Sequence, residues 1–298
     1  MQSVKKIDIH AHATLYPALQ PAIPRRKPLI SSKELIKCYN RLNIEKGVLL
    51  PLQSPEGMWS CTTGEEMKLA VDQDPDRLLW FCCVDPRAGE NTPNTDLTLL
   101  LNHYKALGAK GVGELTANLY TDDPKVDNLF RCCEECQMPV TIHISPDFSC
   151  YYGIVDDLGL PRLEKMLKKY PKLKILGHSQ PFWAEMSADI TAETRNHYPT
   201  GKVTDGRVAQ LMRDYENLYC DFSAGSGANA LMRDPDYAAR FLEEFSDRVL
   251  YGTDISTASI DEPLAFDAFL DRMVADGMLS MDNYVKLVRS NAIRLLNL

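Results

Sequence analysis

The sequence predicts a (β/α)8 barrel, the TIM-barrel fold, as a single domain over residues 1–298 with an extra C-terminal helix. Eight short apolar runs start 29 to 44 residues apart, which is the length of one strand plus one helix. Several runs are apolar throughout, as expected for parallel strands that are buried on both faces. Helix-like segments separate the runs, and this alternation repeated eight times favours a barrel over the alternative, an open doubly wound sheet.

The expected strands, in chain order, are Val4–His10, Lys46–Leu52, Leu78–Val84, Lys110–Leu115, Pro139–Ile144, Leu173–His178, Asn217–Phe222 and Arg248–Thr253. Helices are expected where capping residues or prolines precede a helical pattern. These are Ser31–Leu42, Pro93–Leu107, Pro124–Gln137, Arg162–Tyr170, Val203–Tyr215, Pro235–Phe245, Asp261–Asp276 and Ser280–Leu296. Two long irregular segments, Ala13–Ile30 and Ser179–Lys202, follow strand ends and are expected to overhang the barrel mouth.

The composition, with 45% hydrophobic and 25% charged residues, is that of a soluble globular chain. A net charge of −8 argues against nucleic-acid binding, which needs clustered basic residues. We expect no membrane span and a cytoplasmic location, because no run approaches the roughly 18 apolar residues of a membrane helix and the first residues lack the apolar centre of a signal peptide. The nine cysteines are an odd number and are expected to be reduced thiols.

Ionisable residues gather where the expected strands end, which is where barrels build their sites. His10 and His12 end the first strand and Glu114 ends the fourth. The others end the fifth, sixth and eighth strands: His143, His178 and Asp254. Because successive side chains of a strand alternate, His10 and His12 are expected to point the same way, together with Asp8. Asp8 is expected either to accept a hydrogen bond beside the ligands or to be a buried carboxylate at the bottom of the barrel.

Burying four imidazoles and two carboxylates in one barrel mouth is costly unless they pair or coordinate a cation. The set therefore predicts a divalent metal. Taken singly, each residue has a plainer interpretation. His143 or His178 alone is more often a hydrogen-bonded core histidine, Glu114 an ion-pair partner, and Asp254 a helix cap.

The ordered set resembles the amidohydrolase superfamily of metal-dependent hydrolases. The stretches Ile175–His178, Asn217–Ser223 and Leu250–Asp254 are similar to its "amidohydrolase 2" branch, which includes the aminocarboxymuconate-semialdehyde decarboxylase relatives. The resemblance covers essentially the whole chain. The order of these residues over five strands is specific for the superfamily, but it says little about the substrate.

The resemblance implies a ligand set. In two-metal members, His10, His12 and Asp254 hold one ion, His143 and His178 hold the second, and Glu114 bridges them. In one-metal members, His10, His12, His143 and Asp254 bind the ion, which leaves His178 as acid, base or electrophile. The ion is expected to be Zn²⁺, with Mn²⁺ as the alternative, at one or two per chain.

The expected activity is hydrolysis of an amide, ester or lactone of a small molecule by a metal-bound hydroxide, with Asp254 moving the proton and His178 stabilising the oxyanion. A metal-dependent decarboxylase is the alternative, and Glu114 favours hydrolysis because decarboxylase sites do not need a bridging acid. A TatD-like nuclease is less expected, since the segment after Glu114 departs from the nuclease motif. A non-catalytic barrel is also less expected, because the ligand set is intact.

The two long loops suggest the substrate contacts. Arg25 and Arg26 lie on the first loop, and Phe182 and Trp183 lie on the second, so an anionic or aromatic substrate group is a hypothesis. The plainer interpretation is surface charge and loop packing. A homo-oligomer is expected on general grounds, although no part of the sequence locates an interface.

Overall fold

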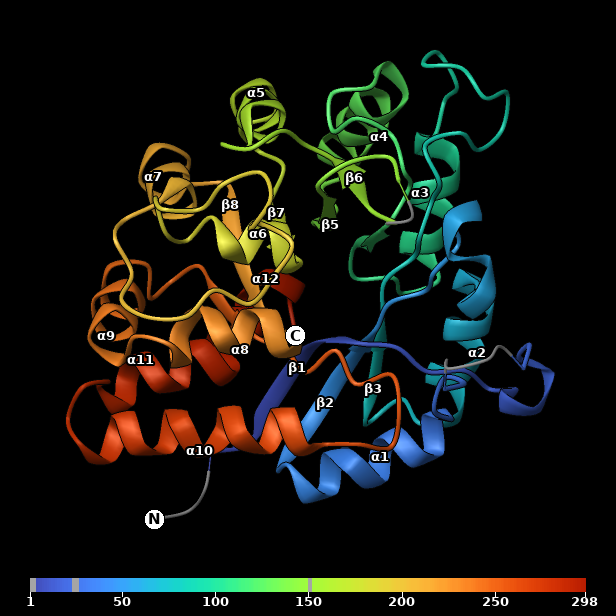
Figure 1. Cartoon of the computed structure of the whole chain (residues 1–298). Coiled ribbons are helices and arrows are strands. Elements are labelled where there is room, and N and C mark those ends of the chain that lie inside the picture. Colours follow the sequence, from blue (N-terminus) through green and yellow to red (C-terminus); the bar gives the residue numbers. More distant parts are fainter. Residues whose placement is uncertain (1–3, 23–26, 150–151) are drawn as a thin grey trace.

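The computed structural model describes residues 4–22, 27–149 and 152–298 and shows strands surrounded by an outer layer of helices (Figure 1). All strand pairs within the described ranges are parallel. The strands are β1 (Lys6–Ala11), β2 (Ile44–Leu49), β3 (Leu78–Trp80), β4 (Val112–Leu115), β5 (Val140–Ser145), β6 (Ile154–Val155), β7 (Ile175–His178), β8 (Leu218–Phe222) and β9 (Val249–Tyr251). Each of the eight predicted strands is present, and β6 is a short addition beside β5.

Backbone hydrogen bonds join two strand sets into one ring. The order β1-β2-β3 forms one set and β4-β5-β7-β8-β9 the other. At the first junction, the N–H of Cys82 donates to Gly111 O at 3.0 Å, and the N–H of Gly113 donates to Cys82 O at 2.8 Å. At the second, the N–H of Asp254 donates to His10 O at 2.8 Å. The predicted barrel is therefore confirmed, and the predicted open sheet alternative is wrong.

The outer helices follow the predicted order, and local capping explains several of their starts. In α1 (Ser32–Arg41), Ser31 and Glu34 form the expected capping box. The remaining helices are α2 (Gly64–Gln73), α3 (Thr98–Ala106), α4 (Pro124–Glu135), α5 (Pro161–Lys169), α6 (Gln180–Ala184), α7 (Arg207–Asp214), α8 (Ala224–Met232), α9 (Pro235–Glu244), α10 (Asp261–Ala275), α11 (Met281–Val285) and α12 (Asn291–Leu296). Short 3-10 turns occupy Pro17–Leu19 and Pro55–Ser60, and a π-helical turn, Lys286–Ser290, joins α11 to α12.

Helices α2, α6 and α8 were not predicted. The first four residues of α8 include two glycines, Gly225 and Gly227, which disfavour helix, so the sequence pattern there indicates a turn. Packing reverses that preference, because a Cβ at Gly227 would lie 2.7 Å from the backbone carbon of Phe222. Close contact with β8 therefore requires glycine at a position where helix propensity argues against it.

The barrel interior is filled by aliphatic side chains and closed at one end by the C-terminal helix. Ile9, Leu176 and Leu250 pack there with Leu295 and Leu296 of α12. A larger apolar layer lies between the strands and the outer helices. The predicted extra C-terminal helix thus has a structural function, because it covers the end of the barrel opposite the strands' carboxyl ends.

Two sequence expectations about environment can be compared with the structure. The cysteines of the described ranges are free thiols, and all but Cys61 are buried. None of the helices in those same ranges combines the length and the hydrophobicity that crossing a membrane requires.

The substitution Gly47→Ala tests how α1 packs on β2. A Cβ at Gly47 would lie 2.0 Å from Oη of the fully buried Tyr39. We expect the overpacking to lower the free energy of unfolding by about 1–3 kcal/mol in urea titrations. Gly57→Ala is the control, because its nearest neighbour would be Leu52 Cβ at 3.9 Å. Equal stability of the two variants would contradict the described packing.

A pH effect is expected at the start of α5. Asp156 is buried, and its carboxylate accepts the N–H groups of Asp157, Arg162 and Leu163. Burial outweighs these bonds and raises its pKa to about 6. Because the folded state then holds the proton more tightly, stability is lost as pH rises from about 4 to about 6. The unfolding free energy of wild type should fall across this range relative to Asp156→Asn, and parallel pH profiles would exclude the effect.

Candidate metal centre

The ionisable residues predicted to gather at the strand ends come together at one end of the barrel. His10 lies on β1, Glu114 on β4, His143 on β5 and His178 on β7. His143 and His178 are direct register partners on neighbouring strands. His12 follows β1 and Asp254 follows β9. The carboxyl ends of parallel strands share one rim of a barrel, so these residues are near one another in space.

Three imidazoles of this cluster have the Nδ1 atom fixed by the protein. His10 Nδ1 lies 2.6 Å from Asp221 Oδ2, His12 Nδ1 lies 2.8 Å from Leu50 O, and His178 Nδ1 lies 2.9 Å from Ser223 Oγ. A carbonyl oxygen only accepts, so His12 carries a proton on Nδ1, which leaves Nε2 as the atom that takes a second proton or a metal ion. The carboxylate of Asp221 likewise fixes a proton on Nδ1 of His10 and leaves its Nε2 facing the cluster.

The two Nε2 atoms then meet at the centre of the site. His10 Nε2 and His12 Nε2 are 3.1 Å apart. His12 Nε2 also lies 3.3 Å from Asp254 Oδ1 and 3.4 Å from Glu114 Oε2. Two imidazole nitrogens and two carboxylates at this separation repel one another unless protons or a metal ion lie among them. Within the described residues, two overlapping groups could hold a metal ion: His10, Glu114 and His178, and His10, His12 and Asp254.

Glu114 connects these groups to His143. Its Oε1 atom lies 2.6 Å from His143 Nδ1 and 3.8 Å from His178 Nε2. Neither of the potential metal groups in the described chain includes His143. The structure therefore places His143 beside the cluster, in contact with the carboxylate that the sequence assigned as a bridge.

Asp254 is the most accessible member of the cluster. Its side chain is 28% exposed, whereas those of His10, His12, Glu114 and His178 are nearly or completely buried. The residue has φ 54°, a left-handed conformation in the segment that follows β9. Asp254 is consequently placed between the buried imidazoles and the open mouth.

The charges of the cluster favour a cation. Burial disfavours a protonated His10, but the Asp221 carboxylate outweighs it and raises the pKa of His10 to about 9. Burial would raise the pKa of Glu114, but His143 and His12 hold that pKa well below its usual range. Burial and the charge of His10 lower the pKa of His178 to about 4, so its ring is neutral at pH 7.

Asp8 does not join the imidazoles, contrary to the simple alternation expected for β1. The strand shifts register against β2 between Asp8 and Ala11, which pair with Gly47 and Leu49, so three steps of β1 match two of β2. The Asp8 carboxylate instead accepts the N–H of His10 and the N–H of Thr253, at 3.0 and 2.9 Å. It ties β1 to the turn that carries Asp254.

Sequence reasoning missed Asp221 and Ser223 as site residues. Both lie at the end of β8, and each contacts one histidine of the cluster. The available signal was an aspartate that follows the apolar run of β8, since Asp221 is completely buried.

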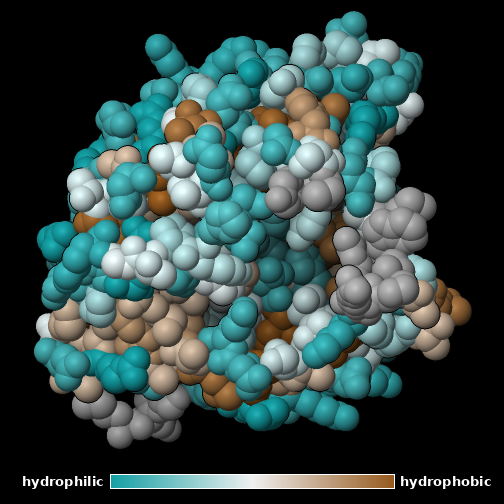
Figure 2. Space-filling model, in the orientation of Figure 1, coloured by the Kyte–Doolittle hydropathy of each residue, from teal (hydrophilic) through white to brown (hydrophobic). Residues whose placement is uncertain are grey.

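A pocket of about 220 Å³ leads to the cluster through His143, His178 and Asp254. Neutral polar and aromatic groups complete its lining, including Tyr152, Gln180, Asn196, Tyr198 and Ser226. Figure 2 shows that this face is mostly hydrophilic and is hollowed near its centre. The pocket is large enough for a small molecule only.

Phe182 and Trp183, which the sequence suggested as substrate contacts, do not face the pocket. Phe182 and Trp183 are 0% and 3% exposed and belong to the core. The Phe182 ring occupies the space left by the missing Cβ of Gly177, and Trp183 stacks on Phe222. Their plainer interpretation, loop packing, is the one the geometry supports. Arg25 and Arg26 lie outside the described residues.

Comparisons with known proteins identify the class. The model of the amidohydrolase family matches residues 7–298. The chain belongs to the amidohydrolase family, whose members are metal-dependent enzymes. No curated protein matches the sequence.

Solved structures share the fold at low identity. The chain is similar to 2,6-dihydroxybenzoate decarboxylase from Rhizobium, at 17% identity and a TM-score of 0.63 with 99% of each chain covered. It is also similar to a probable 2-pyrone-4,6-dicarboxylic acid hydrolase from Acinetobacter baumannii, at 15% identity and a TM-score of 0.61, with 99% of this chain and 100% of that chain covered. An uncharacterised TIM-barrel protein from Bordetella bronchiseptica has 16% identity and a TM-score of 0.63, with 99% of each chain covered.

The substitution Asp221→Asn tests the hydrogen bond to His10. Losing the carboxylate that orients the ring should weaken metal binding by about 10–100-fold, measured by chelator competition. Asp276→Asn, which removes an exposed carboxylate just after α10, is the control and should leave the affinity unchanged. An unchanged affinity in Asp221→Asn would show that His10 is not a ligand oriented by this contact.

Proposed function

We propose that this chain is a metal-dependent hydrolase that cleaves an amide, ester or lactone bond of a small molecule. The observation that carries the proposal is the 3.1 Å approach of His10 Nε2 to His12 Nε2, with both Nδ1 atoms held by hydrogen-bond acceptors. Nε2 atoms this close, facing two carboxylates, need a cation. The raised pKa of His10 shows that protons meet this need without a metal, and because the family is metal-dependent we infer that a metal ion replaces them. The small polar pocket at the rim supports a small-molecule substrate.

The residues that would hold the ion are His10, His12 and Asp254, with Glu114 and His178 beside them. Both potential groups share His10 Nε2, and one nitrogen lone pair serves one ion. The geometry therefore favours one ion per chain. Imidazole and carboxylate ligands suit Zn²⁺, with Mn²⁺ as the alternative.

A divalent metal supplies Lewis acidity, which brings the pKa of its bound water to about 7 and polarises a carbonyl oxygen. Asp254 is placed to take a proton from the attacking water and return it to the leaving group. Burial acts to raise the pKa of Asp254, but the His12 hydrogen bond and the charge of His10 outweigh it and keep that pKa below its usual value. Asp254 is therefore ionised and able to act as a base.

His178 is placed to stabilise the developing oxyanion. Because its ring is neutral, one nitrogen carries the proton, and the contact with Ser223 Oγ at Nδ1 determines which one. When the Ser223 hydroxyl donates to Nδ1, the His178 proton sits on Nε2 and points to the cluster. That tautomer provides a hydrogen-bond donor to an oxygen of the substrate.

A decarboxylase is the second candidate, supported by the similarity in fold to a dihydroxybenzoate decarboxylase. Glu114 favours hydrolysis. Its carboxylate is buried and ionised beside the histidines, where it would repel the carboxylate of an acid substrate. Incubation of the zinc-loaded protein with esters, lactones, amides and aromatic acids distinguishes a hydrolase from a decarboxylase. We expect hydrolysis without release of carbon dioxide, and release of carbon dioxide without hydrolysis would overturn the proposal.

The substitution Asp254→Asn should lower kcat for hydrolysis by about 10²–10⁴-fold, because the general base is lost. Elemental analysis of the same protein reports how far metal binding also falls. Asp261→Asn, an exposed acid at the start of α10, is the matched control and should retain full activity. Retention of activity by Asp254→Asn would remove Asp254 from the proposed mechanism.

A further inference from the structure

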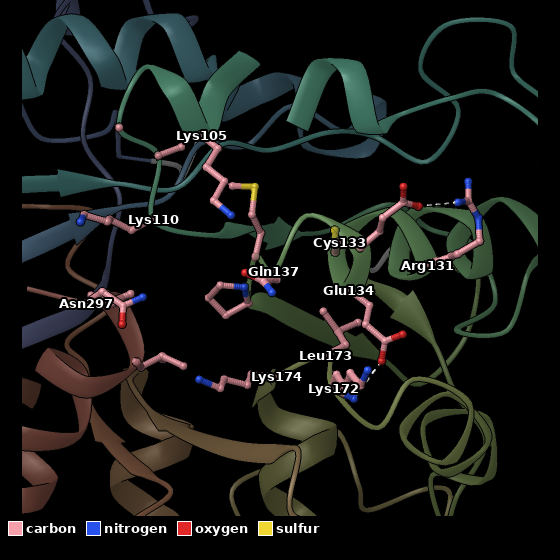
Figure 3. Close-up of a pocket in the computed structure, with 17 residues that line it drawn as sticks. Lys105, Lys110, Arg131, Cys133, Glu134, Gln137, Lys172, Leu173, Lys174 and Asn297 are labelled. Atoms are coloured by element: carbon pink, nitrogen blue, oxygen red, sulfur yellow. Dashed lines mark hydrogen bonds and ion pairs between the residues drawn. The ribbon is translucent and has the colours of Figure 1, made fainter. Parts of the chain in front are cut away.

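A second hollow, of about 920 Å³, lies at the opposite end of the barrel from the metal centre (Figure 3). It is formed by the segments that precede β4, β5 and β7, by residues of α3 and α4, and by the end of α12 with Asn297. Met138, Leu173 and Leu296 lie beneath it and are at most 2% exposed, so the accessible groups are mainly the polar ones. Its volume is within the range of small-molecule sites, about 300–1,000 Å³.

Lysine side chains from separate segments of the fold enter this hollow. Lys105 comes from α3, Lys110 precedes β4, and Lys172 and Lys174 precede β7. Lys105 Nζ donates to the backbone oxygen of Cys136 at 2.6 Å. Within the described chain, none of these four ammonium groups forms an ion pair with a carboxylate.

The acidic residues of the hollow are already engaged elsewhere. Glu135 pairs with Arg131 at 3.1 Å, and Glu134 Oε1 accepts the backbone N–H of Lys172 at 2.8 Å. The hollow therefore holds four lysines against one carboxylate, Glu134, that is not paired with an arginine, in a chain whose net charge is −8. A concave surface lined by charges of one sign focuses the electric field and attracts ions of the opposite charge. The lysine cluster should therefore attract anions.

We propose that this hollow binds a small multivalent anion that carries phosphate or carboxylate groups. The lysine side chains contact the anionic groups. A concave site of this size favours a small molecule over nucleic acid, which binds along extended basic stripes.

The proposed site is separate from the metal centre. Lys110 and Lys174 each precede a residue of the cluster by four positions, Glu114 on β4 and His178 on β7. Four strand residues span about 13 Å, so the two sites lie at opposite ends of the same two strands. Substitutions of these lysines therefore leave the proposed catalytic residues in place.

Calorimetric titration of the metal-loaded protein tests the proposal. The probes are phenyl phosphate and benzene-1,3,5-tricarboxylate, which distinguish the phosphate from the carboxylate source. We expect saturable binding that weakens with added salt. The double variant Lys110→Gln/Lys174→Gln should bind at least about tenfold more weakly, which corresponds to about 1.4 kcal/mol. Its hydrolytic activity should equal that of wild type, which shows that the barrel is intact.

The matched control is Lys33→Gln/Lys37→Gln, which removes the same charge from exposed positions on α1. It should retain the affinity of wild type. Absence of saturable binding of both probes would overturn the proposal. Equal weakening of binding by the two double variants would also overturn it, because the probes would then bind through the net charge of the protein. Loss of binding in Asp254→Asn would overturn it as well, because the probes would then bind at the metal centre.

Discussion

The site depends on the hydrogen bonds that hold His10 and His12 by their Nδ1 atoms. Asp221 and Leu50 O fix the two rings so that both Nε2 atoms are directed at one place, 3.1 Å apart. This arrangement is unfavourable for two neutral imidazoles and favourable once a cation is shared between them. The barrel provides the rigidity, because each anchor comes from a different strand or strand end.

The surrounding contacts bring the carboxylates to the same place. Asp8 ties the backbone of His10 to Thr253, which immediately precedes Asp254. His143 holds Glu114, and Ser223 holds His178. Every group of the cluster is thus fixed by a second residue, which is how metal sites in proteins set the orientation of their ligands. His143, His178 and Asp254 combine this fixation with access to the pocket, and Asp254 is the most exposed of the three.

The sequence was sufficient for the eight strands because each is a short apolar run, and for most helices because their caps are local signals. It was insufficient where packing overrides propensity, as in α8, where Gly227 fits closely against Phe222. The clustering of His10, Glu114, His178 and Asp254 follows from strand ends sharing one rim. The contact between Asp221 and His10, the register shift after Asp8 and the burial of Phe182 depend on three-dimensional packing, which no local pattern encodes.

Zinc X-ray absorption spectroscopy of the metal-loaded protein tests the central claim most directly. The account predicts a first coordination shell of nitrogen and oxygen at about 2.0–2.1 Å, with multiple scattering from at least two imidazoles that falls in His12→Gln. A shell containing sulfur at about 2.3 Å, or imidazole scattering that is unchanged in His12→Gln, would contradict it.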